Sequence, residues 1–177
     1  SLVLNKAYEF IEKLRNQAFT YILVGNHDLI NNQQFQTTNH WMNGMKEWDN
    51  VKVVDTSVIR NHGDYKFVFC PYVPVGTFSQ ALDTLKEEWN DSTCIFAHQE
   101  FFGCKMGAII SEHGDKWGKD LPFVVSGHIH SNQTLESGVY YPGSAMQNAF
   151  GESDHNIIPI FEFTNDGHDY KEVDLGL

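Results

Sequence analysis

The chain has 177 residues, of which 41% are apolar and 14% aromatic, and this apolar content excludes a disordered polymer. It carries 12 Lys and Arg residues against 23 Asp and Glu residues, and the net charge of −11 argues against broad electrostatic binding to nucleic acid. Within these residues no apolar run approaches the roughly 20 that cross a bilayer, and we expect no membrane association. Three widely spaced cysteines predict no disulfide framework, so we expect an intracellular, reducing compartment.

The predicted elements alternate between helices and short strands, and they indicate one mixed α/β unit over residues 1–177 without repeats or linkers. In chain order we predict a helix over residues 2–17, a strand over 21–24, a helix over 33–48, strands over 51–54 and 65–70, a helix that begins at a capping box over 77–80, and strands over 94–97, 123–126, 139–141 and 157–163.

Three of the predicted strands end in the same way, with an imidazole just beyond a buried apolar run. The first strand leads into Gly25-Asn-His-Asp28, the second into His98, and the third into Gly127-His-Ile-His130. Ligand sites in open α/β sheets lie outside the carboxyl ends of the strands, so these three ends can meet at one sheet edge. Glycine at two of the junctions allows the backbone to bend sharply there.

The spacing of His128 and His130 places both imidazoles on one side of an extended backbone. Two imidazoles that face one way can serve two adjacent metal ions, which two-metal hydrolases hold about 3.5–4 Å apart. A single histidine is more often a surface residue or a hydrogen-bonded core residue. We assign that ordinary role to the remaining histidines, namely His40, His62, His113, His155 and His168.

The ordered set Gly25-Asn-His-Asp28, His98 and Gly127-His-Ile-His130 resembles the third, fourth and fifth motifs of the calcineurin-like metallophosphoesterases. The resemblance covers residues 21–163. It implies an α/β fold, namely the C-terminal part of a four-layer sandwich in which two mixed β-sheets are flanked by helices. It also implies two divalent metal ions, with manganese favoured and iron or zinc as alternatives.

The resemblance also implies a role for each matched side chain. Asn26, His98 and His128 would bind the second metal, and His130 would bind the first. His27 would be the catalytic residue, which protonates the leaving oxygen or stabilises the transition state. Asp28 would either orient His27 or cap the turn with its carboxylate.

A further segment resembles the SbcD-type subunits of double-strand-break repair nucleases, namely Tyr141-Pro-Gly-Ser144 followed by Phe150-Gly-Glu152. Those enzymes cut DNA with manganese and work with a coiled-coil ATPase. The resemblance therefore implies a DNA exo- or endonuclease of repair or recombination, located in the cytoplasm or at the nucleoid, and it allows a homodimer. The intervening residues 145–149 lack the arginine that is frequent in that family, so the resemblance implies no contact of that arginine with the phosphate backbone.

The family's first two motifs, Asp-x-His and Gly-Asp-x-x-Asp, do not occur before Gly25. We therefore expect residues 1–177 to be one partial metallophosphoesterase domain that is inactive alone. Two other functions stay open. One is a metallophosphoesterase that acts on a nucleotide, a phosphoprotein or a small phosphodiester, and the other is a non-catalytic remnant that binds a partner or one metal. Cys94 and Cys104 flank His98, but we expect both thiols in the core rather than in a zinc site.

Overall fold

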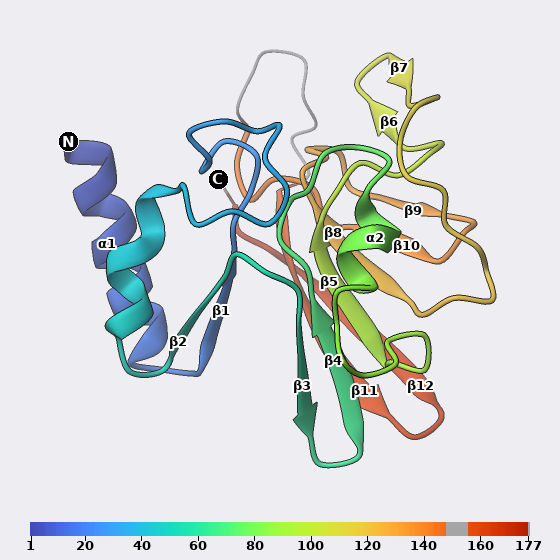
Figure 1. The fold of residues 1–177 in the computed structure, drawn as a ribbon, viewed down its shortest axis with the longest axis horizontal. Coiled ribbons are helices and arrows are strands. Elements are labelled where there is room, and N and C mark those ends of the chain that lie inside the picture. Colours follow the sequence, from blue (N-terminus) through green and yellow to red (C-terminus); the bar gives the residue numbers. More distant parts are fainter. Residues whose placement is uncertain (148–155, 177) are drawn as a thin grey trace.

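The computed structural model describes residues 1–147 and 156–176. Its elements include two short α-helices, one 3₁₀ helix and many short strands (Figure 1). Their bounds are α1 (Leu2–Arg15), β1 (Thr20–Leu23), η1 (Trp41–Glu47), β2 (Val51–Val54), β3 (Val58–His62), β4 (Tyr65–Phe69), α2 (Phe78–Leu82), β5 (Cys94–His98), β6 (Lys105–Met106), β7 (Ile109–Ile110), β8 (Val124–Gly127), β9 (Gln133–Leu135), β10 (Val139–Tyr141), β11 (Ile157–Thr164) and β12 (Gly167–Asp174).

The largest element is a six-stranded mixed sheet with the order β3-β4-β5-β8-β10-β9. The neighbours among β4, β5, β8 and β10 pair in parallel, and the edge strands β3 and β9 are antiparallel to theirs. Central parallel strands are buried on both faces, which is why β5 and β8 are short apolar runs. Their carboxyl ends point toward the same edge of the sheet, at the top of Figure 1.

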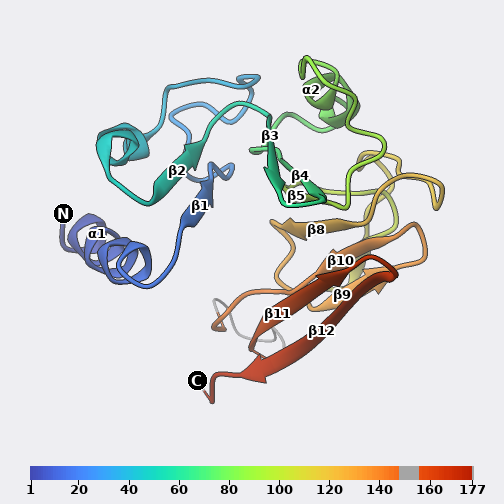
Figure 2. The same cartoon turned by 90° about the horizontal axis from the view of Figure 1, so that it is seen from below.

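Different elements cover the two faces of this sheet. On one face, Phe78 and Leu82 of α2 pack into a core cluster with Val68, Ile95 and Val124. On the other face, the antiparallel hairpin of β11 and β12 lies across the sheet, as Figure 2 shows from below. Aromatic rings of the hairpin pack against aromatic rings of the sheet and so join the two layers. The ring pairs are Phe67–Phe163, Phe96–Phe163, Phe123–Phe161 and Tyr140–Phe161.

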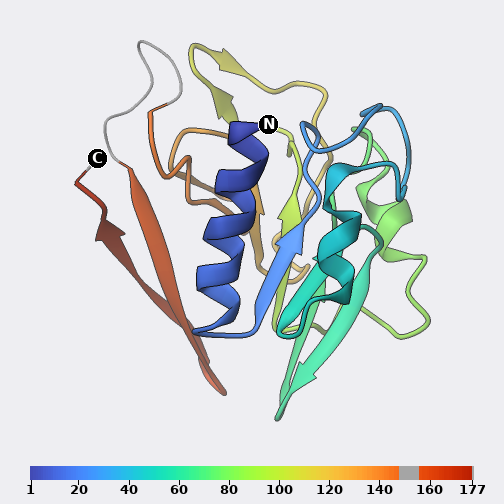
Figure 3. The same ribbon diagram turned by 90° about the vertical axis from the view of Figure 1, so that its left-hand side faces the viewer.

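A second, smaller sheet consists of β1 and β2, which pair in parallel from Thr20↔Val51 to Leu23↔Val54. Helix α1 and the 3₁₀ helix η1 flank this pair (Figure 3), and together they form a separate apolar cluster. The backbone N–H of Tyr72 donates to Val24 O at 2.8 Å. Since Val24 follows β1 and Tyr72 follows β4, this bond fixes the end of the small sheet against the end of the large one.

The structure confirms the α/β class, with one mixed six-stranded sheet, several two-stranded sheets and few helices, and it corrects several predicted elements. The helix predicted over residues 33–48 forms only as a 3₁₀ helix over residues 41–47, because the polar stretch before it has no apolar face to bury. The helix predicted from residue 77 ends at Leu82, and the Thr77 side chain makes no capping bond to it. The short strands β3, β6, β7 and β9 and the longer strand β12 had no separate prediction.

Within residues 1–147 and 156–176, no helix combines the length and the apolar character that crossing a bilayer requires.

Candidate metal-binding site

One cavity of about 700 Å³ opens where β1, β5 and β8 end, and every side chain that the sequence predicts for the site lines it. Those predicted residues are Asn26, His27, His98, His128 and His130. The rest of the wall among the described residues is Met106, Gly107, Gly127, Ile129, Ser131, Gly143 and Ser144. The strand-end pattern therefore predicted the place of this cavity in the fold.

The carboxamide of Asn26 lies between two imidazoles. Asn26 Oδ1 is 3.1 Å from His98 Nε2 and 3.2 Å from His128 Nδ1. The centroids of the two rings are 5.3 Å apart, with 61° between their planes. Two ring nitrogens and one amide oxygen thus converge on one point from three different strand ends.

The turn that carries Asn26 and His27 is closed by reciprocal hydrogen bonds. Asp28 N donates to Gly25 O at 3.1 Å, and Gly25 N donates to Asp28 Oδ2 at 2.8 Å. The other carboxylate oxygen of Asp28 accepts from Trp41 Nε1 at 2.8 Å. Asp28 therefore caps the turn and fixes it to η1, which is the second of its two predicted roles. Each of its oxygens accepts one of these bonds, and its other predicted role, to orient His27, stays a prediction.

Two glycines form the seat of the His98 ring. A Cβ atom at Gly127 would lie 2.8 Å from His98 Nδ1, and one at Gly25 would lie 3.0 Å from His98 Nε2. Contacts below 3 Å are too close for real side chains, so Gly127 in particular must lack a Cβ for the ring to occupy this position. The sequence predicted these glycines as sharp bends, whereas the structure shows them as the space that the imidazole fills.

The backbone that carries His128 and His130 is held by the segment after the motif. His128 adopts a φ of +82°, a left-handed conformation that costs free energy in a residue other than glycine. Ser144 N donates to His130 O at 3.0 Å. A Cβ at Gly143, whose φ is +80°, would lie 2.8 Å from that same oxygen. The Tyr141-Pro-Gly-Ser144 turn therefore packs directly on the backbone of His130.

Burial favours the neutral form of two of the imidazoles, those of His98 and His128. Burial, together with smaller effects of the neighbouring imidazoles of His128, His27 and His130, lowers the pKa of His98 to about 3. Burial also lowers the pKa of His128, although the charge of Glu100 acts in the opposite direction. A neutral imidazole is the form that binds a metal ion, so the electrostatics of the pocket suit this use.

The donor set fits one metal ion well and a second one only in part. The ligands for the one ion would be Asn26, His98 and His128, which offer two nitrogens and one oxygen without a thiolate. Within the described residues, no cluster of three or more His, Cys, Asp or Glu side chains is placed to hold a metal. His130 lines the same cavity, but a second ion there would need further ligands.

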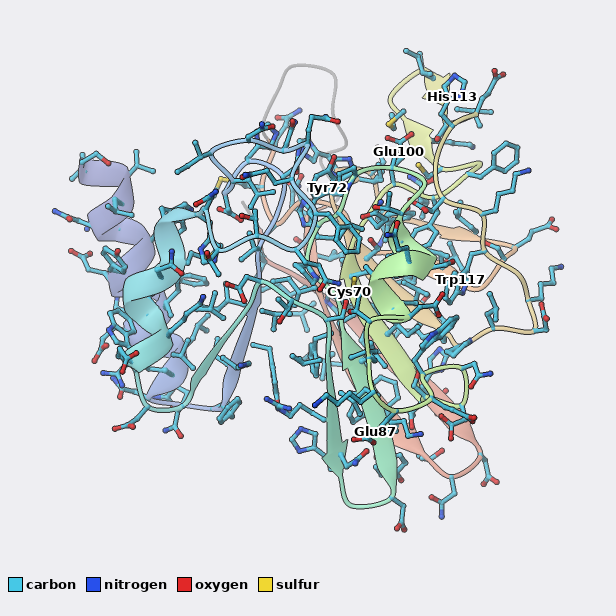
Figure 4. The ribbon with its side chains drawn as sticks, viewed as in Figure 1. Cys70, Tyr72, Glu87, Glu100, His113 and Trp117 are labelled. Carbon is cyan, nitrogen blue, oxygen red and sulfur yellow. The ribbon has the colours of Figure 1, made fainter. Side chains whose placement is uncertain are left out.

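Sequence reasoning missed several residues around the cavity. The ring of Tyr72 lies 5.8 Å from that of His128 and 6.4 Å from that of His98, and Figure 4 places it near Glu100 where the strands end. Gln99 and Ser126 join the ends of β5 and β8, since Gln99 N donates to Ser126 Oγ at 2.9 Å. Tyr72 follows a strand without any polar motif, so no local signal in the sequence marks it.

The other histidines have ordinary structural roles where the structure describes them. His40 is buried, accepts from Met42 N at 3.1 Å, and contacts Asp55 Oδ2 at 3.1 Å. His168 stacks on Phe123 with ring centroids 4.0 Å apart. It belongs to Asp166-Gly-His168, which has the letters Asp-x-His but lies at the turn between β11 and β12. His155 lies outside the described residues. So do Phe150-Gly-Glu152 and residues 148–149, which end the stretch 145–149 that lacks arginine.

Cys94 and Cys104 are both fully buried, Cys104 within the main core cluster, and all three cysteines are free. Burial raises the pKa of the Cys104 thiol, and it does so more strongly for Cys94. Neither sulfur is among the groups that line the cavity. These thiols therefore pack as apolar groups, as the sequence predicted.

The chain is similar to two viral proteins that are named as putative phosphoesterases. The chain is 52% identical over 174 residues, 97% of its length, to "Putative phosphoesterase 078R" of Invertebrate iridescent virus 3. It is 51% identical over 163 residues, 92% of its length, to "Putative phosphoesterase 244L" of Invertebrate iridescent virus 6. No family model matches it. These relatives support a phosphoesterase family for the chain.

The chain spans about half the length of the curated relatives it matches, covering 50% of the first protein and 58% of the second.

Proposed function

We propose that this chain supplies part of the active site of a metal-dependent phosphodiesterase of the calcineurin-like superfamily. The observation that carries the proposal is the convergence of His98 Nε2 and His128 Nδ1 on Asn26 Oδ1, in a cavity that His27 and His130 also line. Neutral imidazoles and an amide oxygen are suitable ligands for manganese, iron or zinc, and we favour manganese from the resemblance. The phosphoesterase relatives support the same chemistry.

The side chains of the cavity divide into binding and proton-transfer roles. Asn26, His98 and His128 would hold one divalent ion and His130 would contribute to a second. When bound, the ions would neutralise charge on the phosphate and activate a water molecule. His27 lies on the tight turn beside this group and lines the cavity. It is placed to give a proton to the oxygen that leaves the phosphate, as a general acid.

The proposed fold is the C-terminal part of a four-layer sandwich, completed by a segment upstream of α1. Among the described residues β1 pairs only with β2, so its other edge is open. Phe10, Leu14 and Tyr21 line an apolar groove of about 380 Å³ beside that edge. An added strand would pair with the open edge and cover the groove. It would also bring the missing ligands of the first metal to the same side of the sheet.

We propose DNA as the substrate, as in the SbcD-type nucleases, with a coiled-coil ATPase as the partner in the whole protein. Support comes from Tyr141-Pro-Gly-Ser144, which packs on the backbone of His130 and so belongs to the site. A nucleotide or another small phosphodiester is the second candidate. It is favoured by the absence of Lys and Arg from the described cavity lining and by the net charge of −11.

The proposal is tested by hydrolysis of bis-p-nitrophenyl phosphate with manganese. We expect little turnover by the 177-residue chain and clear turnover by a longer protein that includes the upstream segment. In the longer protein, His27→Ala should lower the rate by roughly 10²- to 10⁴-fold, as expected for the loss of a general acid.

His62→Ala is the matched control, because His62 is exposed at the far end of β3 and outside the cavity lining. Its rate should stay near that of the unchanged protein. Robust hydrolysis by the 177-residue chain alone would contradict the account of the incomplete site.

A further inference from the structure

A small hairpin overhangs one side of the cavity. Strands β6 and β7 pair in antiparallel register, Lys105 with Ile110 and Met106 with Ile109, and a two-residue turn joins them. Gly107 begins that turn with a φ of +63°, which fits the tight turns that close hairpins. Met106 and Gly107 line the cavity together with the four imidazoles.

The two faces of the hairpin differ in what they present. Residues directly opposite each other in an antiparallel pair lie on the same face, so Ile109 stands beside Met106. Lys105 and Ile110 occupy the other face. Met106 is 37% exposed and Ile109 is 66% exposed, which is unusual for side chains that could pack in the core. The face next to the imidazoles is therefore apolar and accessible.

The hairpin is held firmly at its base. The Gln133 side chain accepts from Lys105 N at 2.8 Å and donates to Lys105 O at 2.9 Å, which ties β6 to the end of β9. Ser111 N donates to Cys104 O at 2.8 Å and closes the other strand. Bonds at both strands place the apolar face beside the cavity before any ligand binds, so little ordering is needed on binding.

The chemistry of the cavity wall suggests what this face contacts. The described lining contains imidazole, amide, hydroxyl and apolar groups, and it contains no Lys, Arg, Asp or Glu. A phosphodiester bound at the imidazoles would therefore meet an apolar surface on the side of Met106. An uncharged planar ring attached near the phosphate can pack on such a surface, whereas a second charged group there would lose its hydration without gaining a partner.

We propose that the Met106 and Ile109 face of the hairpin is a specificity surface for phosphodiesters that carry an uncharged planar ring beside the phosphate, as an unpaired nucleotide does. The inference rests on the proposed function, because it needs the phosphate to bind at Asn26, His98 and His128. It adds the substrate class that the site selects: nucleotide diesters whose base is free to leave its stack, in preference to diesters without a ring.

Methyl-labelled methionine allows a direct test by NMR, because the chain has only four methionines. The chain is loaded with Zn²⁺, which is diamagnetic, and titrated with thymidylyl-thymidine or with dimethyl phosphate, which lacks a ring. We expect the Met106 methyl signal to shift with the dinucleotide, through the ring current of the base, and to stay in place with dimethyl phosphate. Met42 and Met45 are buried residues of η1 and serve as internal references.

Paired variants test the two faces of the hairpin. Ile109→Ser should weaken thymidylyl-thymidine binding by roughly tenfold, as for loss of a base-stacking contact, and should leave dimethyl phosphate binding within about twofold. Ile110→Ser is the matched control, since it removes the same side chain from the opposite face of the same short hairpin. Equal losses in both variants would overturn the inference, as would a Met106 signal that ignores the dinucleotide.

The imidazole signals separate failure of this inference from failure of the proposed function. If the nitrogens of His98 and His128 respond to Zn²⁺ and then to dimethyl phosphate while Met106 stays silent with the dinucleotide, only the specificity surface is wrong. If those nitrogens respond to neither, the proposed metal-dependent function is wrong, and the inference falls with it.

Discussion

At the scale of single residues, the site depends on two glycines that lack a Cβ as much as on the predicted ligands. The His98 ring fills the space that a Cβ at Gly25 or Gly127 would need. That contact joins residues from three separate parts of the chain, so no local pattern in the sequence could show it. The strand–turn–histidine pattern, in contrast, is local, and it predicted all of Asn26, His27, His98, His128 and His130 as lining one site.

Gly127→Ala tests the seat of His98 directly. The added methyl group would lie 2.8 Å from His98 Nδ1, so the ring must move and Nε2 must leave its position beside Asn26 Oδ1. We expect the Zn²⁺ affinity of the chain, measured by calorimetry, to fall by roughly 10- to 100-fold, comparable to the loss of an outer contact that orients a ligand.

The control for this variant is Gly44→Ala in η1, because a Cβ there meets no atom within 4 Å and the glycine has no positive φ. Its Zn²⁺ affinity should match that of the unchanged chain. If Gly127→Ala also binds Zn²⁺ normally while remaining folded, the ring of His98 does not depend on this seat for its function.

At the scale of elements, strands with a clear apolar run were predicted to within one or two residues, including β2, β5, β8 and β10. The errors lie where tertiary contacts decide the structure. The stretch before η1 is rich in Asn and Gln and does not form the expected helix. Strand β12 lacks an apolar run but completes a long hairpin by pairing with β11 from Ile157↔Asp174 to Thr164↔Gly167. Pairing of that kind is set by the partner strand and the turn.

A buried carboxylate links several elements to the end of β5, and its loss should cost stability. Asp115 is only 8% exposed and accepts from Gly76 N at 3.0 Å, Phe78 N at 3.1 Å and Gln99 Nε2 at 2.8 Å. Asp115→Asn keeps the shape but turns one acceptor into a donor that faces other donors. We expect the free energy of unfolding, measured with urea, to fall by about 2–3 kcal/mol.

Asp64→Asn is the comparison for this substitution, since Asp64 is exposed in the turn between β3 and β4. Its unfolding free energy should change by less than about 0.5 kcal/mol. Because Gln99 directly follows His98, the Asp115 variant should also show altered NMR signals of the His98 imidazole. If its urea unfolding midpoint and its His98 signals both match those of the unchanged chain, the hydrogen bonds of Asp115 do not support the site.

At the scale of the whole molecule, charge and open surfaces set what the chain can do by itself. Its net charge is −11, and the open edge of β1 lies beside an apolar groove. The first property opposes binding to a polyanion, and the second suits a further segment of a longer protein. The sequence shows the first of these properties but not the second. Net charge can be counted, but the open edge appears only once β1 is seen to pair with β2 alone among the described residues.

Binding of the chain to DNA should therefore be weak and dependent on metal. Each phosphate contact needs a cation that releases a counterion, and the described lining of the cavity holds no Lys or Arg. Lys105 belongs to the hairpin beside the cavity, but it lies on the face of the hairpin opposite to Met106. Bound metal ions would be the main positive charges at the site, so their removal should weaken binding further. Fluorescence anisotropy with a labelled single-stranded oligonucleotide, with and without manganese at about 150 mM salt, measures this directly. Tight binding that persists without metal would show that a basic surface elsewhere on the chain, rather than the imidazole site, recognises the nucleic acid.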